Sequence, residues 1–113
     1  MFSLGSHHQY FLYRSPVDMR KGFNGLSGIV TNELDRDPVS GEVFVFVNRH
    51  RNLIKLLHWE KGGFVVYYKR LEKGTFLLPE DRGDGVLDWP ELVLMVAGIQ
   101  VEGYRQRPRY IPG

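Results

Sequence analysis

The fold is decided by residues 38–79, PVSGEVFVFVNRHRNLIKLLHWEKGGFVVYYKRLEKGTFLLP. Aromatic and β-branched residues fill this stretch, the glycines at Gly62-Gly63 and Gly74 interrupt it, and Lys and Arg outnumber Glu. Short runs of such residues between glycine turns are typical of antiparallel strands joined by hairpins. The stretch therefore predicts a β-platform that carries positive charge, a surface suited to binding more than to catalysis.

The periodicity of the whole chain predicts one α+β fold. Strands are expected over residues 43–47, 53–59, 64–71 and 75–78, with 10–14 as the candidate for a fifth. Apolar residues at helical spacing predict a first helix over residues 19–35, with Asp18 as its N-cap. A capping box at Asp88 and Glu91 predicts the start of a second helix. We expect an antiparallel β-meander of four to five strands with two helices packed against it.

Length and charge indicate a single domain with a polyanionic partner. The 113 residues fit one domain, whose ends at residues 1–9 and 104–113 are expected to be flexible. The net charge is only +2, but bases crowd residues 49–73 and 105–109, while acids crowd residues 33–42 and 80–91. A basic side separated from an acidic side favours binding of a polyanion.

No feature of the sequence predicts secretion or a membrane partner. Cysteine is absent, which excludes disulfides and thiolate metal sites. The first eight residues lack the charged and apolar regions of a signal peptide. The longest uncharged apolar run, residues 92–99, is far shorter than the roughly 20 residues that span a bilayer. We therefore expect a cytoplasmic protein.

Strand alternation sorts the central hairpin into two faces. Lys55, Tyr68 and Arg70 share one face, whereas Lys69 lies on the other. A two-residue turn at Gly62-Gly63 would set Lys55 opposite Arg70, a like-charge pair that needs an anion or an acidic side chain between its members. A four-residue turn would set Lys55 opposite Tyr68 instead, and the sequence leaves both registers open.

The basic residues of the hairpin are candidate contacts for nucleic acid. Phosphates would contact Arg49, Arg51, Lys55, Lys69 and Arg70, while Tyr68 packs on sugar or base. Arg20 and Lys21 are further candidates, because cations at a helix start oppose the helix dipole and an anionic partner would explain them. A third group, Arg105, Arg107 and Arg109, resembles an arm that clamps phosphate. The alternative for each residue is a side chain that simply extends into solvent.

No arrangement of residues predicts catalysis, and we expect no enzyme activity, cofactor or metal. The four histidines lack metal-ligand spacing, and the carboxylates of residues 80–88 lack the spacing of a calcium loop. A phosphate-cradling glycine loop and a nucleophile elbow are both missing. A hydrolytic enzyme would require a carboxylate or histidine cluster that converges only in the folded chain.

Three motifs carry a resemblance to a known family: VDMRKGFNGL at residues 17–26, DPVSGEVFVFVNR at 37–49 and IKLLHWEKGGFVVYYKRLEKGTF at 54–76. The chain resembles the accessory protein of insertion sequence 66 family transposons, the second-reading-frame product often called TnpB, which is unrelated to the RNA-guided nuclease of that name. Leu78 departs from the family pattern, which often has an aromatic residue there. The resemblance brings no agreed catalytic residues. Its matched candidates are Asp18, Arg20, Lys21, Lys55, Trp59, Tyr68, Lys69 and Arg70.

The resemblance implies a role in transposition beside a separate transposase that carries the strand-transfer chemistry. Our first hypothesis is a non-catalytic accessory protein that binds transposon DNA through the basic hairpin. The alternative is an adaptor in which the sheet and acidic residues 80–91 dock the transposase without direct DNA contact. The expected partners are thus the transposase of the same element and DNA, and the sequence leaves the oligomeric state open.

Overall fold

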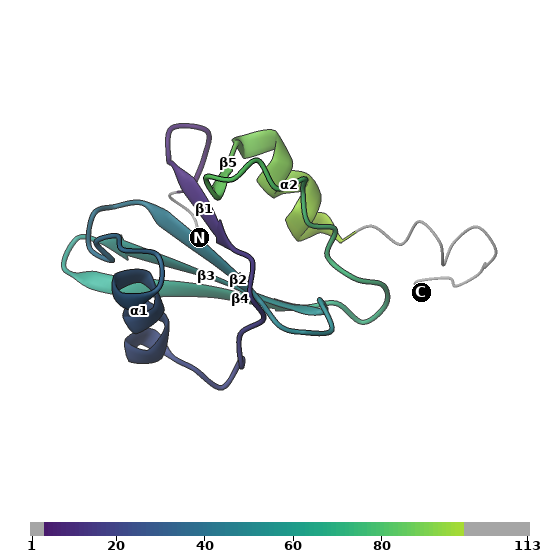
Figure 1. The fold of residues 1–113 in the computed structure, drawn as a ribbon, viewed down its shortest axis with the longest axis horizontal. Coiled ribbons are helices and arrows are strands. Elements are labelled where there is room, and N and C mark those ends of the chain that lie inside the picture. The colour runs from purple at the N-terminus through teal and green to yellow at the C-terminus, as the bar shows by residue number, and fades with distance from the viewer. Residues whose placement is uncertain (1–3, 99–113) are drawn as a thin grey trace.

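The computed structural model describes residues 4–98, which form a five-stranded sheet with one helix on each face (Figure 1). The elements are β1 Tyr10–Tyr13, α1 Phe23–Asn32, β2 Val43–Val47, β3 Leu53–Glu60, β4 Gly63–Arg70, β5 Val86–Leu87 and α2 Trp89–Ala97. The predicted α+β class is confirmed. So are the central strands, although their ends shift by a residue or so.

The sheet is mixed, and this corrects the simple meander. Its strand order is β4-β3-β2-β1-β5, with β1 parallel to β2 and every other pair antiparallel. The candidate strand at residues 10–14 is therefore real, but it lies inside the sheet. Both faces of a parallel pair are usually covered, and the sequences YFLY and VFVFV are apolar at almost every position. A helix on each face supplies that cover.

The strand predicted over residues 75–78 is wrong. Only Thr75 makes an isolated bridge, and Phe76 is buried in the core while its amide donates to the carbonyl of Arg51 (2.7 Å). Pro79 cannot donate to a strand ladder. The strand at the outer side of β1 is instead β5, which lies within the acidic residues 80–91.

Helix α1 begins at Phe23, four residues after the predicted start, and Asp18 is not its N-cap. Gly22 holds the N-cap position. Because glycine has no side chain, no side-chain hydrogen bond caps the start of the helix. Asp18 instead accepts a hydrogen bond from the amide of Arg20 (2.9 Å), which closes a turn before the helix. The helix ends at Asn32, and the chain then turns at Asp35, whose φ is 55°.

The hairpin adopts the register that sets Lys55 opposite Tyr68. Its closing pair is Glu60 and Gly63, so the turn is Lys61-Gly62. Both turn residues have positive φ, 44° and 86°, as the favoured two-residue hairpin turn requires. The like-charge pairing of Lys55 with Arg70 is thereby avoided.

Two apolar clusters fill the space between the sheet and its helices. The cluster on the α2 side is centred on Tyr10, Val45 and Leu56 of the sheet with Leu92 of the helix. The cluster on the α1 side includes Phe11, Phe44, Phe46 and Leu57 of the sheet with Leu26 and Val30 of the helix. Alternate residues of each strand thus serve opposite clusters, as the two predicted hairpin faces require.

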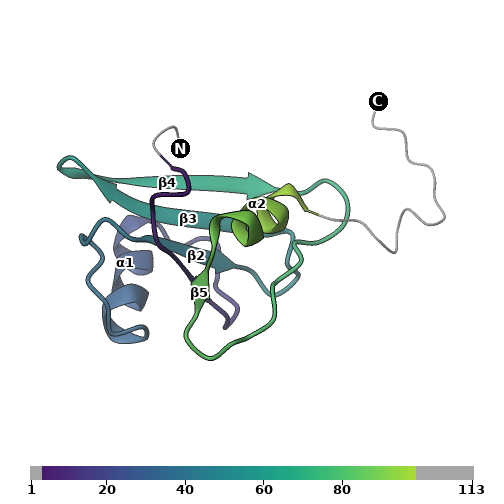
Figure 2. The same cartoon turned by 90° about the horizontal axis from the view of Figure 1, so that it is seen from above.

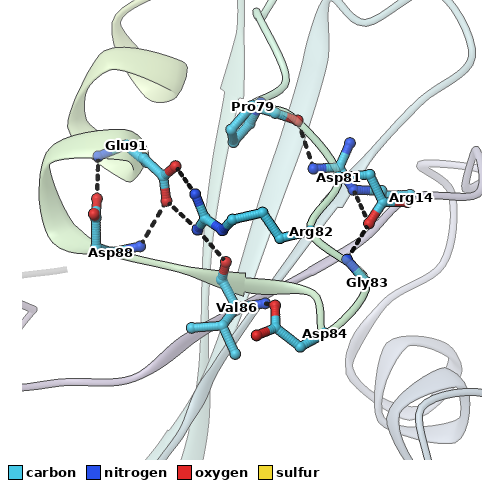
Figure 3. Close-up of polar contacts among 9 residues, drawn as sticks. All are labelled: Arg14, Pro79, Asp81, Arg82, Gly83, Asp84, Val86, Asp88 and Glu91. Atoms are coloured by element: carbon cyan, nitrogen blue, oxygen red, sulfur yellow. Dashed lines mark hydrogen bonds and ion pairs between the residues drawn. The ribbon is translucent and has the colours of Figure 1, made fainter.

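Helix α2 begins at the predicted capping box. The Asp88 carboxylate accepts from the amide of Glu91 (2.8 Å), and the Glu91 carboxylate accepts from the amide of Asp88 (3.0 Å) (Figure 3). Arg82 donates to both oxygens of Glu91 (2.7 and 2.9 Å), so the loop before the helix is tied to the same carboxylate. This pairing lowers the pKa of Glu91 to about 2, chiefly through the hydrogen bond from Arg82.

Candidate nucleic-acid interface

An open hollow of about 430 Å³ brings together three of the residues predicted to bind nucleic acid. Its walls come from the segment after β1, from the β2–β3 turn and from the end of the hairpin. The lining residues are Val17, Asp18, Met19, Arg20, Asn48, Arg49, His50, Leu53 and Tyr68. Arg20, Arg49 and Tyr68 are thus neighbours in the fold although they are widely separated in sequence.

The β2–β3 turn presents Arg49 and His50 on a braced loop. The side-chain oxygen of Asn48 accepts from the amides of Asn52 and Leu53 (3.0 Å each), and its nitrogen donates to the Asn52 side chain (2.7 Å). These bonds close the turn across its base. Arg49, His50 and Arg51 then stand exposed at its tip.

The segment after β1 is anchored at one end and charged at the other. The amide of Val17 donates to the carbonyl of Val47 (3.0 Å), and the Val17 side chain is buried. Asp18 pairs with the Arg20 guanidinium (2.6 Å), and this bond is the main reason that the pKa of Asp18 is lowered to about 2. The Arg20 side chain is nevertheless 91% exposed, so its guanidinium can be shared with an anion.

Lys55 lies beneath this surface and not on it. Its ammonium group donates to the carbonyls of Met19 and Lys21 (2.8 Å each), and the residue is only 9% exposed. The same ammonium lies 4.7 Å from the ring centre of Tyr68, within the range of a cation–π contact. Lys55 therefore fixes the segment before α1 against the sheet.

Tyr68 separates the hollow from a second one of about 300 Å³, which is lined by Tyr68, Arg70 and Glu72. The tyrosine is 52% exposed, so its ring is accessible from solvent. Arg70 and Glu72 form an ion pair of 3.5 Å with both side chains largely exposed. Exposed pairs of this kind contribute little, so Glu72 holds Arg70 only weakly.

The other predicted site residues do not line the hollow. Lys69 lies on the α2 face, where its ammonium donates to the carbonyl of Val96 (2.9 Å) and satisfies the last turn of the helix. Lys21 is exposed beside Arg20, and Arg51 is exposed at the tip of the β2–β3 turn. Arg105, Arg107 and Arg109 lie outside the described residues.

Sequence reasoning missed the parts of the hollow that are not basic. The side chain of Asn48 closes the β2–β3 turn. This role depends on how close β2 and β3 lie at the turn, and no sequence motif indicates it. The sequence offers His50 only as a metal ligand, and it offers Asp18 as a helix cap and as a candidate matched by the family resemblance. Within residues 4–98, no group of His, Asp and Glu side chains is arranged to hold a metal ion.

A separate histidine cluster lies on the α2 face. The rings of His8 and His58 meet edge to face with centres 4.8 Å apart, and His7 lies 4.1 Å from His8. His58 is buried and its Nδ1 is 3.2 Å from the Glu60 carboxylate. Burial, followed by the neighbouring imidazoles, lowers the pKa of His8. The cluster attaches the segment before β1 to β3.

Comparison with known proteins identifies related sequences. Residues 8–106 match the family described as IS66 Orf2 like protein. Two similar proteins come from Sinorhizobium fredii (strain NBRC 101917 / NGR234), and both are described only as uncharacterized. Protein y4jC is 35% identical over 95 residues, which are 82% of this chain and 80% of the relative. Protein y4hO is 30% identical over 100 residues, which are 88% of this chain and 87% of the relative.

The family match extends over both loops of the hollow and over the whole sheet. No solved structure matches the chain. Neither helix in residues 4–98 has the length and hydropathy of a membrane-spanning segment. The resemblance carried by the three sequence motifs is confirmed: the chain belongs to the IS66 Orf2-like family, whose members are accessory proteins associated with transposition.

Proposed function

We propose that this protein binds DNA of the transposon through the surface around Tyr68, at the end of the sheet that carries the β2–β3 turn. This surface, called here the Tyr68 surface, comprises Arg20, Lys21, Arg49, Arg51, Tyr68 and Arg70. The observation that carries the proposal is the hollow that joins Arg20, Arg49 and Tyr68 from three separate segments.

Each group of the Tyr68 surface has a chemical task in such binding. The arginines offer guanidinium donors to phosphate oxygens, which supply most of the affinity of proteins for DNA. Tyr68 offers an exposed ring to a sugar or a base. Arg49 and Arg51 form no ion pair within residues 4–98, so binding phosphate costs them no internal partner.

Acidic neighbours limit the strength of this surface. Asp18 and Glu72 lie beside Arg20 and Arg70, and each reduces the positive potential that DNA meets. Lys55 and Lys69 are engaged with backbone carbonyls, so the proposal does not depend on them. We therefore expect weak binding with little preference for sequence, dominated by the release of counterions.

The test is fluorescence anisotropy of a labelled duplex at low salt and then at rising salt. For Arg49→Gln and Arg51→Gln, the slope of log affinity against log salt should fall by roughly 1 for each phosphate contact removed. Tyr68→Leu should lower the affinity by about 1–3 kcal/mol without changing that slope. Lys61→Gln, at the other end of the eight-residue strands, is the matched control. It should leave the affinity and the salt slope unchanged. Absence of binding at low salt would overturn the proposal.

A second candidate function is docking of the transposase on the α2 side. Leu77, Val93 and Leu94 are 55%, 46% and 60% exposed there. Leu77 and Leu94 also line a groove of about 140 Å³ with Leu78, Pro79 and Glu91. The acidic loop of residues 80–88 adjoins this groove, so a basic, apolar segment of the transposase would suit it. Co-purification of the two proteins from nuclease-treated extract tests this role, because an association bridged by DNA would be lost.

A further inference from the structure

The two edges of the sheet are constructed differently. At the β5 edge, the amide of Leu12 donates to the carbonyl of Gly85 (2.8 Å), so the N–H and C=O of the next residue, Val86, point away from β1. The Val86 amide donates to the Asp84 carboxylate (3.0 Å), and the Val86 carbonyl accepts from Arg82 (3.1 Å) (Figure 3). Side chains of the same chain therefore close this edge.

Strand β4 forms the opposite edge and is four times as long. It pairs with β3 over all eight residues without a bulge, it contains no proline, and its first six residues, GFVVYY, carry no charge. The strand runs along the outer margin of the sheet (Figure 2). Edges that resist pairing with another chain are usually short, bulged or charged along their length. β4 has none of these protections over most of its length.

The hairpin turn determines which backbone groups of β4 face outward. A two-residue turn makes Glu60 and Gly63 a hydrogen-bonded pair, and such pairs alternate with non-bonded ones along the ladder. The N–H and C=O groups that point away from β3 are therefore those of Phe64, Val66, Tyr68 and Arg70. At the β5 edge, Arg82 and Asp84 form hydrogen bonds with the outward backbone groups of Val86. Within residues 4–98, no side chain forms a hydrogen bond with the outward backbone groups of β4.

We propose that β4 pairs antiparallel with β4 of a second copy of this chain, in the register that places Tyr67 opposite itself on a two-fold axis. Such a contact uses the same strand from both copies, as a symmetric dimer requires. It joins the four outward-facing residues of each copy through about eight backbone hydrogen bonds. It also sets Tyr68 opposite Val66, an aromatic and β-branched pair that stabilises sheets.

The charges of β4 favour pairing with a second β4, and they favour antiparallel pairing over parallel pairing. Lys69 and Arg70 lie at one end only, and antiparallel pairing sets them opposite the uncharged Val65 and Phe64. Parallel pairing would set Lys69 opposite Lys69 and Arg70 opposite Arg70 of the second copy, and like charges directly opposite each other destabilise a sheet. Phe64 is already stacked with Phe23, a ring that is 49% exposed, and Arg70 from across the axis would cover this aromatic pair.

The test is the mass of the protein by sedimentation velocity over micromolar to millimolar concentration. The expected species has twice the 13.1 kDa mass of the chain. Tyr68→Pro removes an outward N–H without removing a bond to β3, so it should give a monomer with an unchanged far-ultraviolet spectrum. Tyr68→Val keeps that N–H and should remain a dimer.

Amide hydrogen exchange of the unmodified protein gives a second measurement that does not depend on a variant folding. The amides of Phe64, Val66, Tyr68 and Arg70 should become protected as concentration rises. The amides of Val65 and Tyr67, which face β3, should be protected throughout. A monomer at every concentration, a dimeric Tyr68→Pro variant, or a dimer with unprotected outward amides would each overturn the proposal. DNA binding is tested separately at Arg49 and Arg51, which lie outside β4.

Discussion

At the residue scale, Lys55 shows how a cation that resembles a phosphate ligand can serve the fold. Its ammonium joins β3 to the carbonyls of Met19 and Lys21, which come from a segment more than thirty residues earlier in the chain. Buried carbonyls need a donor, and a charged donor forms stronger hydrogen bonds than a neutral one. The lysine thus holds the segment before α1 against the sheet.

We predict that Lys55→Met lowers the free energy of unfolding by about 2–3 kcal/mol, because two carbonyls lose a charged donor that the thioether cannot replace. Urea denaturation followed by circular dichroism measures the change. Lys21→Met, in the same segment but exposed, is the control and should change the free energy by less than about 0.5 kcal/mol. Equal stability of the two variants would show that the Lys55 bonds contribute nothing.

The sequence could predict the face on which Lys55 lies but not its partners. Alternation along the strand correctly grouped Lys55 with Tyr68 and Arg70, since period-2 geometry needs only local information. Its engagement with Met19 and Lys21 depends on where the segment before α1 crosses the sheet. No local pattern encodes that crossing, so the sequence does not distinguish a buried lysine from an exposed one at this position.

At the element scale, the carboxylate of Glu91 links the start of helix α2 to strand β5. Glu91 caps the helix through the amide of Asp88 and also accepts both donors of Arg82, whose guanidinium reaches the Val86 carbonyl (Figure 3). Loss of the Glu91 charge would therefore loosen the helix start and the loop together. Its pKa is lowered from 4.5 to about 2 for this reason.

We predict that Glu91→Gln lowers the melting temperature at neutral pH and that its effect vanishes below about pH 2. A carboxyl whose pKa is lowered by folding adds stability above its unfolded pKa, and this stability is lost as pH falls through the folded value. The difference between the two proteins should be complete above about pH 5 and disappear toward pH 2. Thermal unfolding across this range measures it, with Glu80→Gln as the control. A difference that stayed constant with pH would contradict the assignment.

Sequence reasoning succeeded for elements with strong local signals and failed for those set by neighbours. The capping box at Asp88 was found because its side chains bond within one turn of helix. Strand β5 was not found, because two residues carry no periodicity. Phe76 was misplaced in a strand, since an apolar side chain anchors a loop to the core as well as it fills a strand.

At the scale of the whole molecule, the two faces of the sheet are chemically distinct. The α1 side presents the Tyr68 surface, whereas the α2 side presents Leu77, Val93, Leu94 and the acidic loop. The uneven charge seen in the sequence corresponds to this division only in part, because Lys55 and Lys69 are internal donors on opposite faces. Charge counts along a chain cannot distinguish a cation used by the fold from one offered to a partner.

We predict that the two faces can be inactivated separately. Leu94→Lys should abolish co-purification with the transposase from nuclease-treated extract and leave the anisotropy of labelled DNA unchanged, because the exposed leucine lies away from the Tyr68 surface. Arg49→Gln should do the reverse. If both variants lose both activities, the surfaces act as one and the division is wrong.

The parallel pairing of β1 with β2 has a consequence for biosynthesis. Tyr10–Tyr13 leaves the ribosome before either of its neighbours, which are residues 43–46 on one side and residues 86–87 on the other. The β3–β4 hairpin can close locally as soon as it is translated, whereas this apolar tetrapeptide keeps one unpaired edge until residues 86–87 are translated. Nascent chains halted before residue 86 therefore carry β1 with one edge unpaired, the segment on which a chaperone would act.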